Sequence, residues 1–319
     1  GCGGMGHRHI LGYKELAQSG IGNIELVAVC DIQIKNAQLV AREAKRLLGK
    51  KPMVFNNLEQ VLDRSDIQAV DIVTDGSTHH QVALPALRSG KHAIVEKPLG
   101  ITIRACKAMI EAAQENNVIL ATAENYRRDP PNRLAKAIID EGLLGNPHLM
   151  IQKSLGGSDI MAITPWRHLK KKGAIGLDMG VHYADIIQYY LGEYDQIFGQ
   201  GLIVEPIRRR PNNANHPLIS YRERVKTFPE TIKATGEDSV IAQYKMKSGV
   251  SVQFACIGGG RGSHTFERSV HGRWGALNAP GERNGRPVTL RLEGKELKGT
   301  DILSMLPNFT HNEITERLF

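Results

Sequence analysis

The sequence has no apolar run long enough to cross a membrane. A transmembrane helix needs about 20 consecutive apolar residues, and no stretch of the 319 residues approaches that length. Hydrophobic residues make up 41% and charged residues 23% of the chain, which is ordinary for a globular protein. The composition therefore predicts a globular enzyme or binding protein without a membrane partner.

Cysteine is scarce and unpaired in the sequence. Cys2, Cys30, Cys106 and Cys256 lie far apart, and no Cys-x-x-Cys pair occurs. Because disulfide frameworks and zinc sites need paired or clustered cysteines, the spacing argues against both and favours a reducing compartment. We expect the cytoplasm.

The basic residues lack interleaved aromatic residues. The formal net charge is +8 and the pI is about 9.3, which favours an anionic partner such as a phosphate-bearing cofactor. The two compact clusters, Lys170–Lys172 and Arg208–Arg210, contain no aromatic side chain on which bases could stack. A solvated face or an anion contact is therefore favoured over a nucleic-acid partner.

The length predicts two domains, which we place at residues 1–123 and 124–319, because single cores usually stop growing near 250 residues. In the first domain, apolar strands alternate with helical patterns. Helices are expected at residues 7–18, 36–48, 58–62, 80–89 and 105–115, and strands at 25–30, 54–55, 69–73, 91–95 and 118–123. This alternation predicts an α/β fold with a doubly wound parallel sheet.

The second domain has a different pattern. Helices are expected at residues 132–141 and 173–191, and strands at 149–155, 197–205, 239–246, 250–256, 266–271 and 288–292. Few helices separate these strands, so an α+β domain with a large, mostly antiparallel open sheet is predicted. Such a sheet has one face free, and we expect it to join subunits of a homodimer or homotetramer.

The first six residues form a glycine-rich motif. Gly1-Cys2-Gly3-Gly4-Met5-Gly6 fits G-x-G-x-x-G and precedes a helical pattern. Gly1 would permit a tight turn, Gly3 the approach of a pyrophosphate, and Gly6 close helix packing, with the phosphate at the helix N-terminus. Such a turn follows a strand, so the first strand of the sheet is expected to be missing from the printed sequence. An ordinary glycine-rich turn is the alternative.

Asp31 ends the strand expected at residues 25–30, about where a dinucleotide-binding domain has an acid that accepts the ribose hydroxyls. A carboxylate here would repel a 2′-phosphate, which predicts NAD. NADP stays possible because Lys35 and Arg8 are close enough to offset the charge.

Lys97 follows a short apolar run in Ile94-Val95-Glu96-Lys97-Pro98. Pro98 cannot donate to a sheet ladder, so the strand stops and the Lys97 side chain can extend from its carboxyl end. Ligands of open α/β sheets bind at that edge. The alternative is a solvated charge beside a turn.

Asp178 and His182 are four residues apart in the helix expected at 173–191, so they share one face, which Asp185 and Tyr189 continue. Three interpretations compete. The stripe could be solvated, although Gly176 and Gly180 suggest close approach of another group. A metal site lacks an evident third ligand, so we expect no metal. The third interpretation is a catalytic pair.

Five separate motifs together resemble one family. They are Gly1–Gly6, Thr74 with His79, Glu96-Lys97-Pro98, Pro165-Trp166-Arg167, and Asp178-x-Gly180-x-His182-x-x-Asp185. Their order and spacing look like the Gfo/Idh/MocA oxidoreductases, which include glucose-fructose oxidoreductase and inositol dehydrogenases. The resemblance implies an NAD(P)-binding domain followed by a substrate-binding domain, and a sugar or polyol as substrate.

The resemblance also implies residue roles. It implies cofactor contacts from the turn residues Gly1, Gly3, Gly4, Met5 and Gly6 and from Asp31, Thr74, His79, Glu96 and Lys97. It implies substrate contacts from Tyr126, Arg127, Trp166, Arg167, Asp178 and His182. Lys97, Asp178 and His182 match the family's catalytic residues. Two departures are Asp75, where the family usually has proline, and Gly173-Ala174 in place of a glycine run. The chain also ends before a closing helical segment of similar proteins.

The expected chemistry is hydride transfer between a nicotinamide and a secondary alcohol. Neutral His182 suits the proton acceptor, and Lys97 would stabilise developing alkoxide charge. Asp178 would fix the imidazole or a neighbouring hydroxyl and keep the lysine charged. These groups are expected to converge over one nicotinamide ring, and which of Lys97 and His182 takes the proton stays open. The alternatives are a redox-assisted glycosidase with retained NAD and a non-catalytic dinucleotide sensor. Residues 206–235 and 258–264 are expected to be long loops that choose the substrate, with Arg261 and His264 as contacts.

Overall fold

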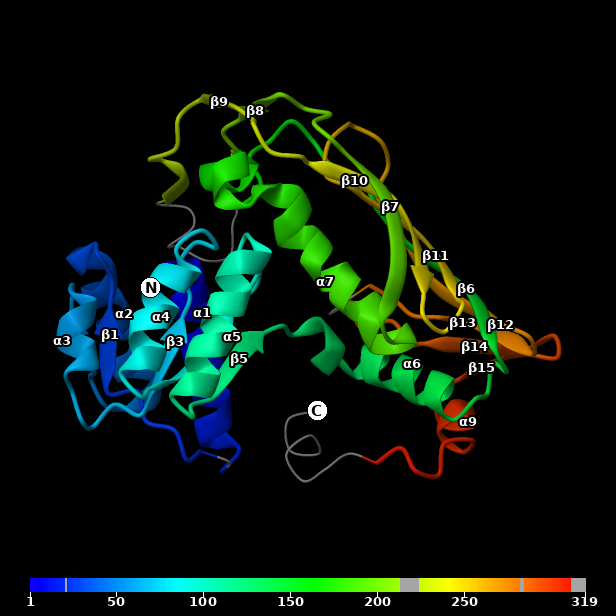
Figure 1. Cartoon of the computed structure of the whole chain (residues 1–319), viewed down its shortest axis with the longest axis horizontal. Helices are drawn as coiled ribbons and strands as arrows, with labels where there is room; N and C mark the ends of the chain where they lie inside the picture. Colours follow the sequence, from blue (N-terminus) through cyan, green and yellow to red (C-terminus); the bar gives the residue numbers. More distant parts are fainter. Residues whose placement is uncertain (21, 213–223, 282–283, 311–319) are drawn as a thin grey trace. The chain divides into compact units, whose positions relative to one another are not determined.

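The computed structural model describes residues 1–20, 22–212, 224–281 and 284–310. They form two compact units, Gly1–Ala123 and Glu124–Thr310, each of which is described by itself (Figure 1). Among the described residues, no helix combines the length and the apolar character that a membrane span requires.

The first unit alternates helices and strands. Its helices are α1 (Gly4–Gln18), α2 (Ile34–Leu48), α3 (Leu58–Leu62), α4 (His79–Arg88) and α5 (Ile103–Glu115). Its strands are β1 (Ala28–Cys30), β2 (Met53–Phe55), β3 (Ala69–Ile72), β4 (His92–Glu96) and β5 (Leu120–Ala123). Each had been expected within a few residues of these bounds.

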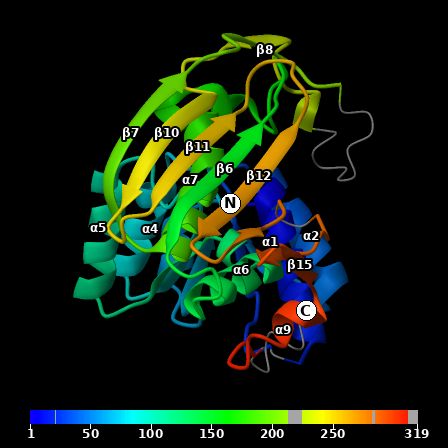
Figure 2. The same cartoon turned by 90° about the vertical axis from the view of Figure 1, so that its right-hand side faces the viewer.

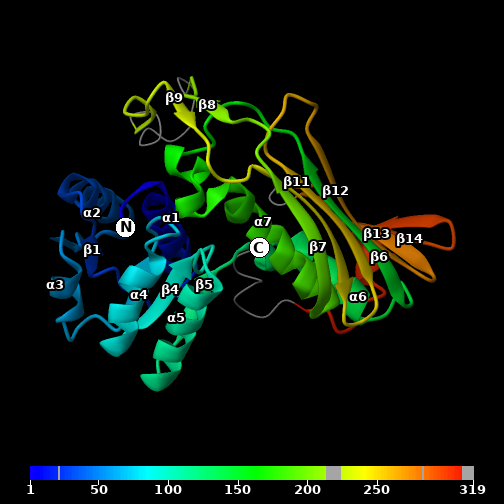
Figure 3. The same ribbon diagram turned by 45° about the horizontal axis from the view of Figure 1, so that its top comes forward.

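Every strand pair of the first unit is parallel. β1 pairs with β2 in one sheet, and β3, β4 and β5 form a second sheet in that order. Helices α4 and α5 lie beside β4 and β5 (Figure 3), and their Leu87 and Met109 are buried against Ile72 and Val95. The predicted parallel α/β architecture is confirmed.

The second unit contains two long helices and most of the strands. Its helical segments are η1 (Tyr126–Arg128), α6 (Pro130–Asp140), η2 (Pro165–His168), η3 (Lys170–Lys172), α7 (Ala174–Leu191) and α9 (Thr300–Leu303). Its first strands are β6 (Pro147–Leu155), β7 (Tyr194–Leu202), β8 (Ile207–Arg209), β9 (Thr231–Lys233) and β10 (Ser239–Met246). The others are β11 (Ser251–Ile257), β12 (Thr265–Gly272), β13 (Gly275–Asn278), β14 (Thr289–Leu292) and β15 (Lys295–Lys298).

Eight strands form one open sheet in the order β15-β14-β13-β12-β6-β11-β10-β7. All neighbours are antiparallel except β6 and β11, so the predicted, mostly antiparallel sheet is confirmed. The sequence pattern missed β13 and β15, which are only four residues long and are held by hairpin pairing rather than by an apolar run. It also missed β8 and β9, which lie in the segment expected to be a loop at 206–235; residues 213–223 of that segment lie outside the described part.

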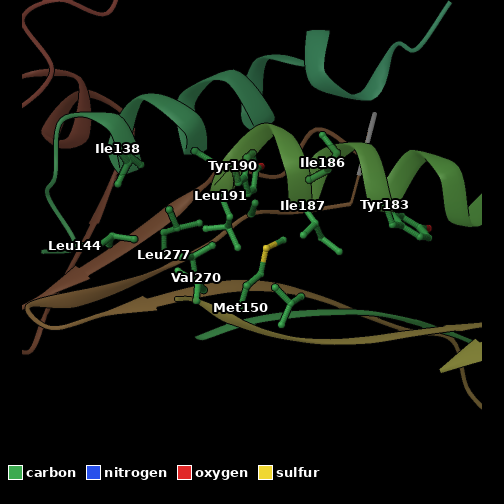
Figure 4. Packing of buried hydrophobic residues seen from close by; sticks show 14 of the residues in the cluster. Ile138, Leu144, Met150, Tyr183, Ile186, Ile187, Tyr190, Leu191, Val270 and Leu277 are labelled. Atoms are coloured by element: carbon green, nitrogen blue, oxygen red, sulfur yellow. The ribbon is translucent and has the colours of Figure 1, made fainter. Parts of the chain in front are cut away.

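Helix α7 packs along one face of this sheet and forms the largest core of the molecule. Figure 4 shows Ile187 and Leu191 of α7 directed toward Met150 and Val270 of the strands, and Ile186 and Ile187 are fully buried. Burying a side chain of this size stabilises a fold by about 1.5–3 kcal/mol. The sheet therefore holds α7 rigidly, together with the polar residues on the rest of its surface.

The opposite face of the sheet, which we call the outer face, is drawn toward the viewer in Figure 2. No helix of the described chain in this unit covers it. Phe198 of β7 and Ile241 of β10 are diagonal neighbours on this face and are 82% and 47% exposed. This face thus exposes large apolar side chains on a rigid surface.

Several of the basic residues in the two compact clusters are paired with acids. Arg208 and Asp238 form a buried ion pair at 2.6 Å, Arg209 pairs with Asp159, and Lys170 lies 3.3 Å from Glu237. These cations therefore stabilise the end of the second unit where β8 and η3 lie.

His168, the last residue of η2, is almost completely buried. Its Nε2 accepts the backbone N–H of Ala162 at 2.9 Å, which fits a neutral imidazole. Burial, reinforced by the positive charge of Arg208 and partly opposed by Asp238, lowers the pKa of His168 to about 4. The folded unit therefore resists protonation of this ring.

This burial predicts acid sensitivity of the second unit. Between pH 6.5 and about 4, the unfolded chain binds a proton at His168 that the folded chain does not. The free energy of unfolding should therefore fall as the pH drops through this window, by up to about 1.4 kcal/mol per pH unit from this residue. In His168→Gln the amide oxygen can accept the same N–H but cannot titrate. The free energy of unfolding of this variant should therefore decrease less at low pH than that of the unsubstituted protein.

Urea unfolding of both proteins at pH 7 and at pH 4.5 measures the difference. The fluorescence of Trp166 and Trp274 reports on this unit, because they are the only two tryptophans in the sequence. If both proteins lost the same free energy of unfolding on acidification, His168 would not be a source of the acid sensitivity.

Candidate active site

The glycine-rich turn has close backbone packing that excludes larger residues. A Cβ on Gly1 would lie 2.9 Å from the carbonyl oxygen of Val73, and a Cβ on Gly6 would lie 2.7 Å from that of Gly1. Helix α1 begins at Gly4, inside the motif, and neither a side-chain cap nor an acidic residue occupies its first turn. The N-terminal N–H groups of α1 are therefore available to an anion.

Asp31 lies directly after β1 and is bound to the glycine-rich turn. Its Oδ2 accepts the backbone N–H of Cys2 at 2.7 Å, and its Oδ1 accepts the N–H of Gln33 at 2.8 Å. The structure thus brings together the turn and the acid that the sequence predicted to bind a dinucleotide.

His79 joins the segments that follow β3 and β4. Its Nδ1 lies 2.8 Å from the carbonyl oxygen of Pro98 and its Nε2 lies 3.3 Å from that of Thr74, and the ring is buried. Asp75, in the place where the resemblance led us to expect proline, accepts the N–H of Ser77 at 3.1 Å and so stabilises the turn before α4.

Lys97 follows β4 directly, as predicted, and its backbone is held by Glu96. The Oε2 of Glu96 accepts the N–H of Lys97 at 2.9 Å, and its Oε1 lies 3.2 Å from His9 Nε2. His9 Nδ1 lies 2.7 Å from Asp71, which also accepts the hydroxyl of Tyr13. Burial lowers the pKa of His9, but the hydrogen bonds to Asp71 and Glu96 outweigh it and raise the pKa to about 9.

In the second unit, the N-terminal half of α7 carries the polar stripe. At the entry to the helix, Gly173 and Ala174 have φ values of 105° and 57°, in the region that favours glycine. Gly176 is approached closely, since a Cβ there would lie 2.9 Å from the carbonyl oxygen of Glu237, whereas Gly180 has open space. Within the described part of the chain, the close approach inferred from the two glycines is therefore seen at Gly176 and not at Gly180.

His182 is held by a carboxylate that the sequence did not assign to it. Its Nδ1 lies 2.7 and 2.9 Å from the two carboxylate oxygens of Glu124. The ring of Tyr126 stacks on the imidazole at a centroid distance of 3.9 Å, with 8° between the planes. All three side chains are largely buried.

Asp178 is paired with Arg167 instead. The Nε of Arg167 donates to Asp178 Oδ2 at 2.8 Å, and its Nη1 donates to Thr164 at 2.9 Å. The guanidinium lies 4.5 Å from the centre of the Trp166 ring. The described contacts thus include an Asp178–Arg167 pair and a Glu124–His182 pair, and the carboxylate at His182 Nδ1 is that of Glu124.

Arg127 makes a third pair with α7. Its Nε donates to Asp185 Oδ2 at 2.8 Å, and its guanidinium lies 5.4 Å from the centre of the Tyr189 ring. The hydrogen bonds to Asp185 raise the pKa of Arg127. Of the residues expected to contact substrate, Asp178 and His182 therefore belong to the stripe on α7. Tyr126, Arg127 and Arg167 contact it, and Trp166 lies against Arg167.

Arg261 and His264, which were expected to help choose the substrate, lie between β11 and β12. Arg261 donates to Asp159 at 3.0 Å within the second unit. Among all residues that the structure describes, no three or more metal-binding side chains form a cluster that could hold a metal ion.

The sequence pattern missed Glu124, His9 and Asp71. Glu124 had one available signal, because it directly follows β5 and so lies at the carboxyl end of a parallel strand. His9 and Asp71 are 62 residues apart, and no local pattern connects them.

Two family models match the chain. The model described as "Oxidoreductase family, NAD-binding Rossmann fold" matches residues 1–124. The model described as "GFO/IDH/MocA C-terminal domain" matches residues 132–278. Together they cover both units.

Curated relatives include two sugar or polyol dehydrogenases. Levoglucosan dehydrogenase from Pseudarthrobacter phenanthrenivorans is 32% identical over 202 residues, which are 62% of this chain and 51% of that protein. The scyllo-inositol 2-dehydrogenase (NAD(+)) from Bacillus subtilis is 35% identical over 205 residues, which are 64% of this chain and 56% of that protein. The chain thus spans about half the length of these relatives.

Solved structures share the fold at low sequence identity. A complex of levoglucosan dehydrogenase with NADH and L-sorbose has a TM-score of 0.75 at 23% identity, covering 94% of this chain and 77% of that one. An oxidoreductase from Agrobacterium radiobacter, solved with NAD⁺, L-tartaric acid and magnesium, has a TM-score of 0.72 at 18% identity and the same coverage of both chains. With both units matched by its models, the chain belongs to the Gfo/Idh/MocA family of oxidoreductases.

Proposed function

We propose that this protein is an NAD-dependent oxidoreductase that transfers a hydride between nicotinamide and a secondary alcohol of a sugar or polyol. The observation that carries the proposal is the buried His182 on α7, hydrogen-bonded at Nδ1 to a carboxylate, in a chain whose other unit carries a dinucleotide cradle. The first unit would be the cofactor domain and the second the substrate domain.

The residues of the first unit fit a dinucleotide. A Cβ at Gly1 or Gly6 would collide with backbone, the first turn of α1 can accept a pyrophosphate, and Asp31 is anchored beside that turn. Gly3, Gly4 and Met5 complete the cradle, and Thr74, His79, Glu96 and Lys97 lie at or just after the ends of β3 and β4. When bound, nicotinamide would supply the hydride chemistry.

The residues of the second unit suit a polyhydroxylated, uncharged substrate. The guanidiniums of Arg127 and Arg167 are each paired with a carboxylate, so they are not unopposed charges for an acidic ligand. Trp166 and Tyr126 add aromatic surface beside these hydrogen-bonding groups. The named relatives that act on inositol or levoglucosan support the same substrate class.

Each catalytic residue would have one task. His182 would accept the hydroxyl proton of the alcohol, and Lys97 would place a positive charge where alkoxide character develops. Asp178 would keep Arg167 oriented toward the substrate. Transfer of the hydroxyl proton to His182 and of the hydride on the carbon that bears the hydroxyl to NAD⁺ would convert the C–OH into C=O.

The outer face of the sheet is proposed as the contact between subunits of a homodimer or homotetramer. It is rigid and uncovered within its unit, and it exposes Phe198 and Ile241. Apolar side chains on a flat, rigid surface are typical of subunit interfaces.

The four cysteines are unpaired. A reducing compartment keeps thiols in this state, so we place the protein in the cytoplasm. Burial raises the pKa values of Cys2 and Cys256 to about 11, which keeps both thiols unreactive.

A panel of sugars and polyols, screened by NADH absorbance with the purified protein, tests the activity. We expect oxidation of at least one neutral polyol or sugar and little oxidation of the corresponding sugar acids. Net hydrolysis of a glycoside without added cofactor would identify the redox-assisted glycosidase instead. Absence of turnover on the whole panel with normal NAD binding would contradict the proposal in favour of a sensor.

Substitution of the two ionisable groups tests their roles. Lys97→Ala and His182→Ala should each lower kcat by about 10²- to 10⁴-fold, because general acid–base catalysis contributes that much. NAD affinity, measured by fluorescence titration, should stay within about threefold. Lys107→Ala, which changes an exposed lysine on α5, is the matched control and should not change kcat. Full turnover in either site variant would remove that residue from the mechanism.

Asp31 should decide the choice of cofactor. Asp31→Asn removes the charge that repels a 2′-phosphate and weakens hydrogen bonds to the ribose, each worth about 1.5–3 kcal/mol for a charged group. The ratio of the Kd for NADP to the Kd for NAD should therefore fall at least about tenfold. Asp63→Asn, an exposed acid of the same unit, should not change it. Tighter binding of NADP by the unsubstituted protein would show that Asp31 has another role.

Charges on the outer face should separate the subunits. Light scattering should give a dimer or tetramer for the unsubstituted protein and a smaller species for Phe198→Asp combined with Ile241→Lys. Ile103→Lys on α5, where the side chain is 77% exposed, is the control and should leave the mass unchanged. A monomer before substitution, or an unchanged oligomer after it, would contradict the assignment of this face.

A further inference from the structure

Glu124 contacts His182 with both oxygens, and its own position is fixed independently. Its Oε1 accepts the backbone N–H of Tyr126 at 3.0 Å, while Oε1 and Oε2 lie 2.7 and 2.9 Å from His182 Nδ1. The side chains of Glu124 and His182 are 9% and 7% exposed. The carboxylate is therefore tied to the backbone of η1 and connects it to α7 within the second unit.

Tyr126 fixes the plane of the same imidazole. Its ring stacks on that of His182 almost in parallel, at 3.9 Å. A contact in the plane of the ring at Nδ1 and a contact on its face together define the orientation of the ring. The covalent geometry of imidazole then directs Nε2 to the edge of the ring away from Nδ1, the atom that Glu124 contacts.

An ionised carboxylate can only accept a hydrogen bond. A neutral imidazole facing it must therefore carry its hydrogen on Nδ1, which leaves the lone pair on Nε2. A histidine that takes a proton from a substrate needs this defined tautomer, because the other one presents a hydrogen where a lone pair is required.

We infer that Glu124 is the positioning residue of His182, which holds the imidazole as the Nδ1–H tautomer so that Nε2 accepts the proton of the substrate alcohol. The inference rests on the proposed function for the part that Nε2 plays in turnover. In that step the O–H bond breaks, its proton forms a bond to Nε2, and a hydride leaves the same carbon for the cofactor. Glu124 accepts the Nδ1 hydrogen bond throughout and compensates the charge of the imidazolium.

Asp178 is the competing candidate for this role, since it lies one helical turn from His182. Its carboxylate is engaged by Arg167 at 2.8 Å, whereas the carboxylate in contact with Nδ1 is that of Glu124. The two acids therefore have different roles. Glu124 defines the tautomer of His182, and Asp178 holds Arg167.

The tautomer can be read directly from ¹⁵N chemical shifts of the histidine rings in uniformly histidine-labelled protein. The signals of His182 are assigned by their loss in His182→Gln. In the unsubstituted protein at neutral pH, Nδ1 should have the shift of a protonated nitrogen and Nε2 that of an unprotonated one. The reverse pattern would overturn the inference whatever the enzyme does with sugars.

Glu124→Gln changes the hydrogen-bond chemistry with little change in shape. The N–H of Tyr126 requires an oxygen at the Oε1 position, 2.7 Å from Nδ1, so the amide nitrogen takes the Oε2 position, 2.9 Å from Nδ1. An acceptor and a donor then compete for Nδ1, where the carboxylate presents two acceptors. The population with the hydrogen on Nε2 should therefore rise. Turnover should fall by about 10²-fold or more, as expected when a catalytic histidine loses its tautomer, while KM for the polyol changes less than about threefold.

Three further variants separate the positioning role from general damage. Glu124→Asp keeps a carboxylate and should retain the Nδ1–H tautomer and more activity than Glu124→Gln. Asp178→Asn should leave the tautomer unchanged although it lowers turnover. Glu193→Gln, an exposed glutamate of the same unit paired with Lys247, should change neither the tautomer nor turnover.

Two results would overturn the inference: an unchanged tautomer in Glu124→Gln, or a change of tautomer in Asp178→Asn rather than in Glu124→Gln. Failure of the proposed function is recognised separately, because it would leave the ¹⁵N shifts as expected and give no oxidation of any polyol. Circular dichroism of each variant reports whether it folds, and Glu124→Asp supplies the comparison where Glu124→Gln does not.

Discussion

Pairing of polar side chains along one face of α7 is the constraint on which the site depends. The helix is otherwise apolar, and it lies against the sheet with Ile186 and Ile187 fully buried. A buried carboxylate or guanidinium without a partner would cost several kcal/mol. The buried Asp178 therefore requires a partner, and it pairs with Arg167 of η2. His182 and Asp185 also contact partners from other segments of this unit, Glu124 just before η1 and Arg127 of η1. The three pairs connect α7 to the segments around it.

The same arrangement explains why the polar groups can be held accurately. One face of α7 is fixed by packing on Met150 and Val270 of the sheet, and the other carries the ion pairs, so the helix cannot rotate without losing both. Sites built on such rigid elements keep their geometry better than sites on loops. The close approach of Glu237 to Gly176 adds a backbone hydrogen bond of 2.9 Å at the start of the helix. Function and stability therefore depend on the same contacts.

Periodicity predicted the elements and the shared face of Asp178 and His182, because both follow from the local geometry of strands and helices. It could not predict which acid meets His182. Glu124 is 58 residues away from His182 in the sequence, while Asp178 and Asp185 lie on the same helix, so spacing alone pointed to these two acids and not to Glu124. The short strands β13 and β15 were missed for a related reason: their pairing, rather than an apolar pattern, defines them. Long-range contacts of this kind have no signal in one sequence.

The two units use a histidine beside carboxylates in different ways. His9 lies between Asp71 and Glu96, and these two acids raise its pKa to about 9, so it is a cation at neutral pH. As a cation it can donate from both nitrogens, and it joins α1 to β3 and β4 while Glu96 holds the backbone of Lys97. A ring with both nitrogens engaged by acids has no lone pair for a substrate proton. His182 has one carboxylate at Nδ1, and its second nitrogen lies on the other edge of the ring. A carboxylate at each ring nitrogen thus makes His9 a structural cation.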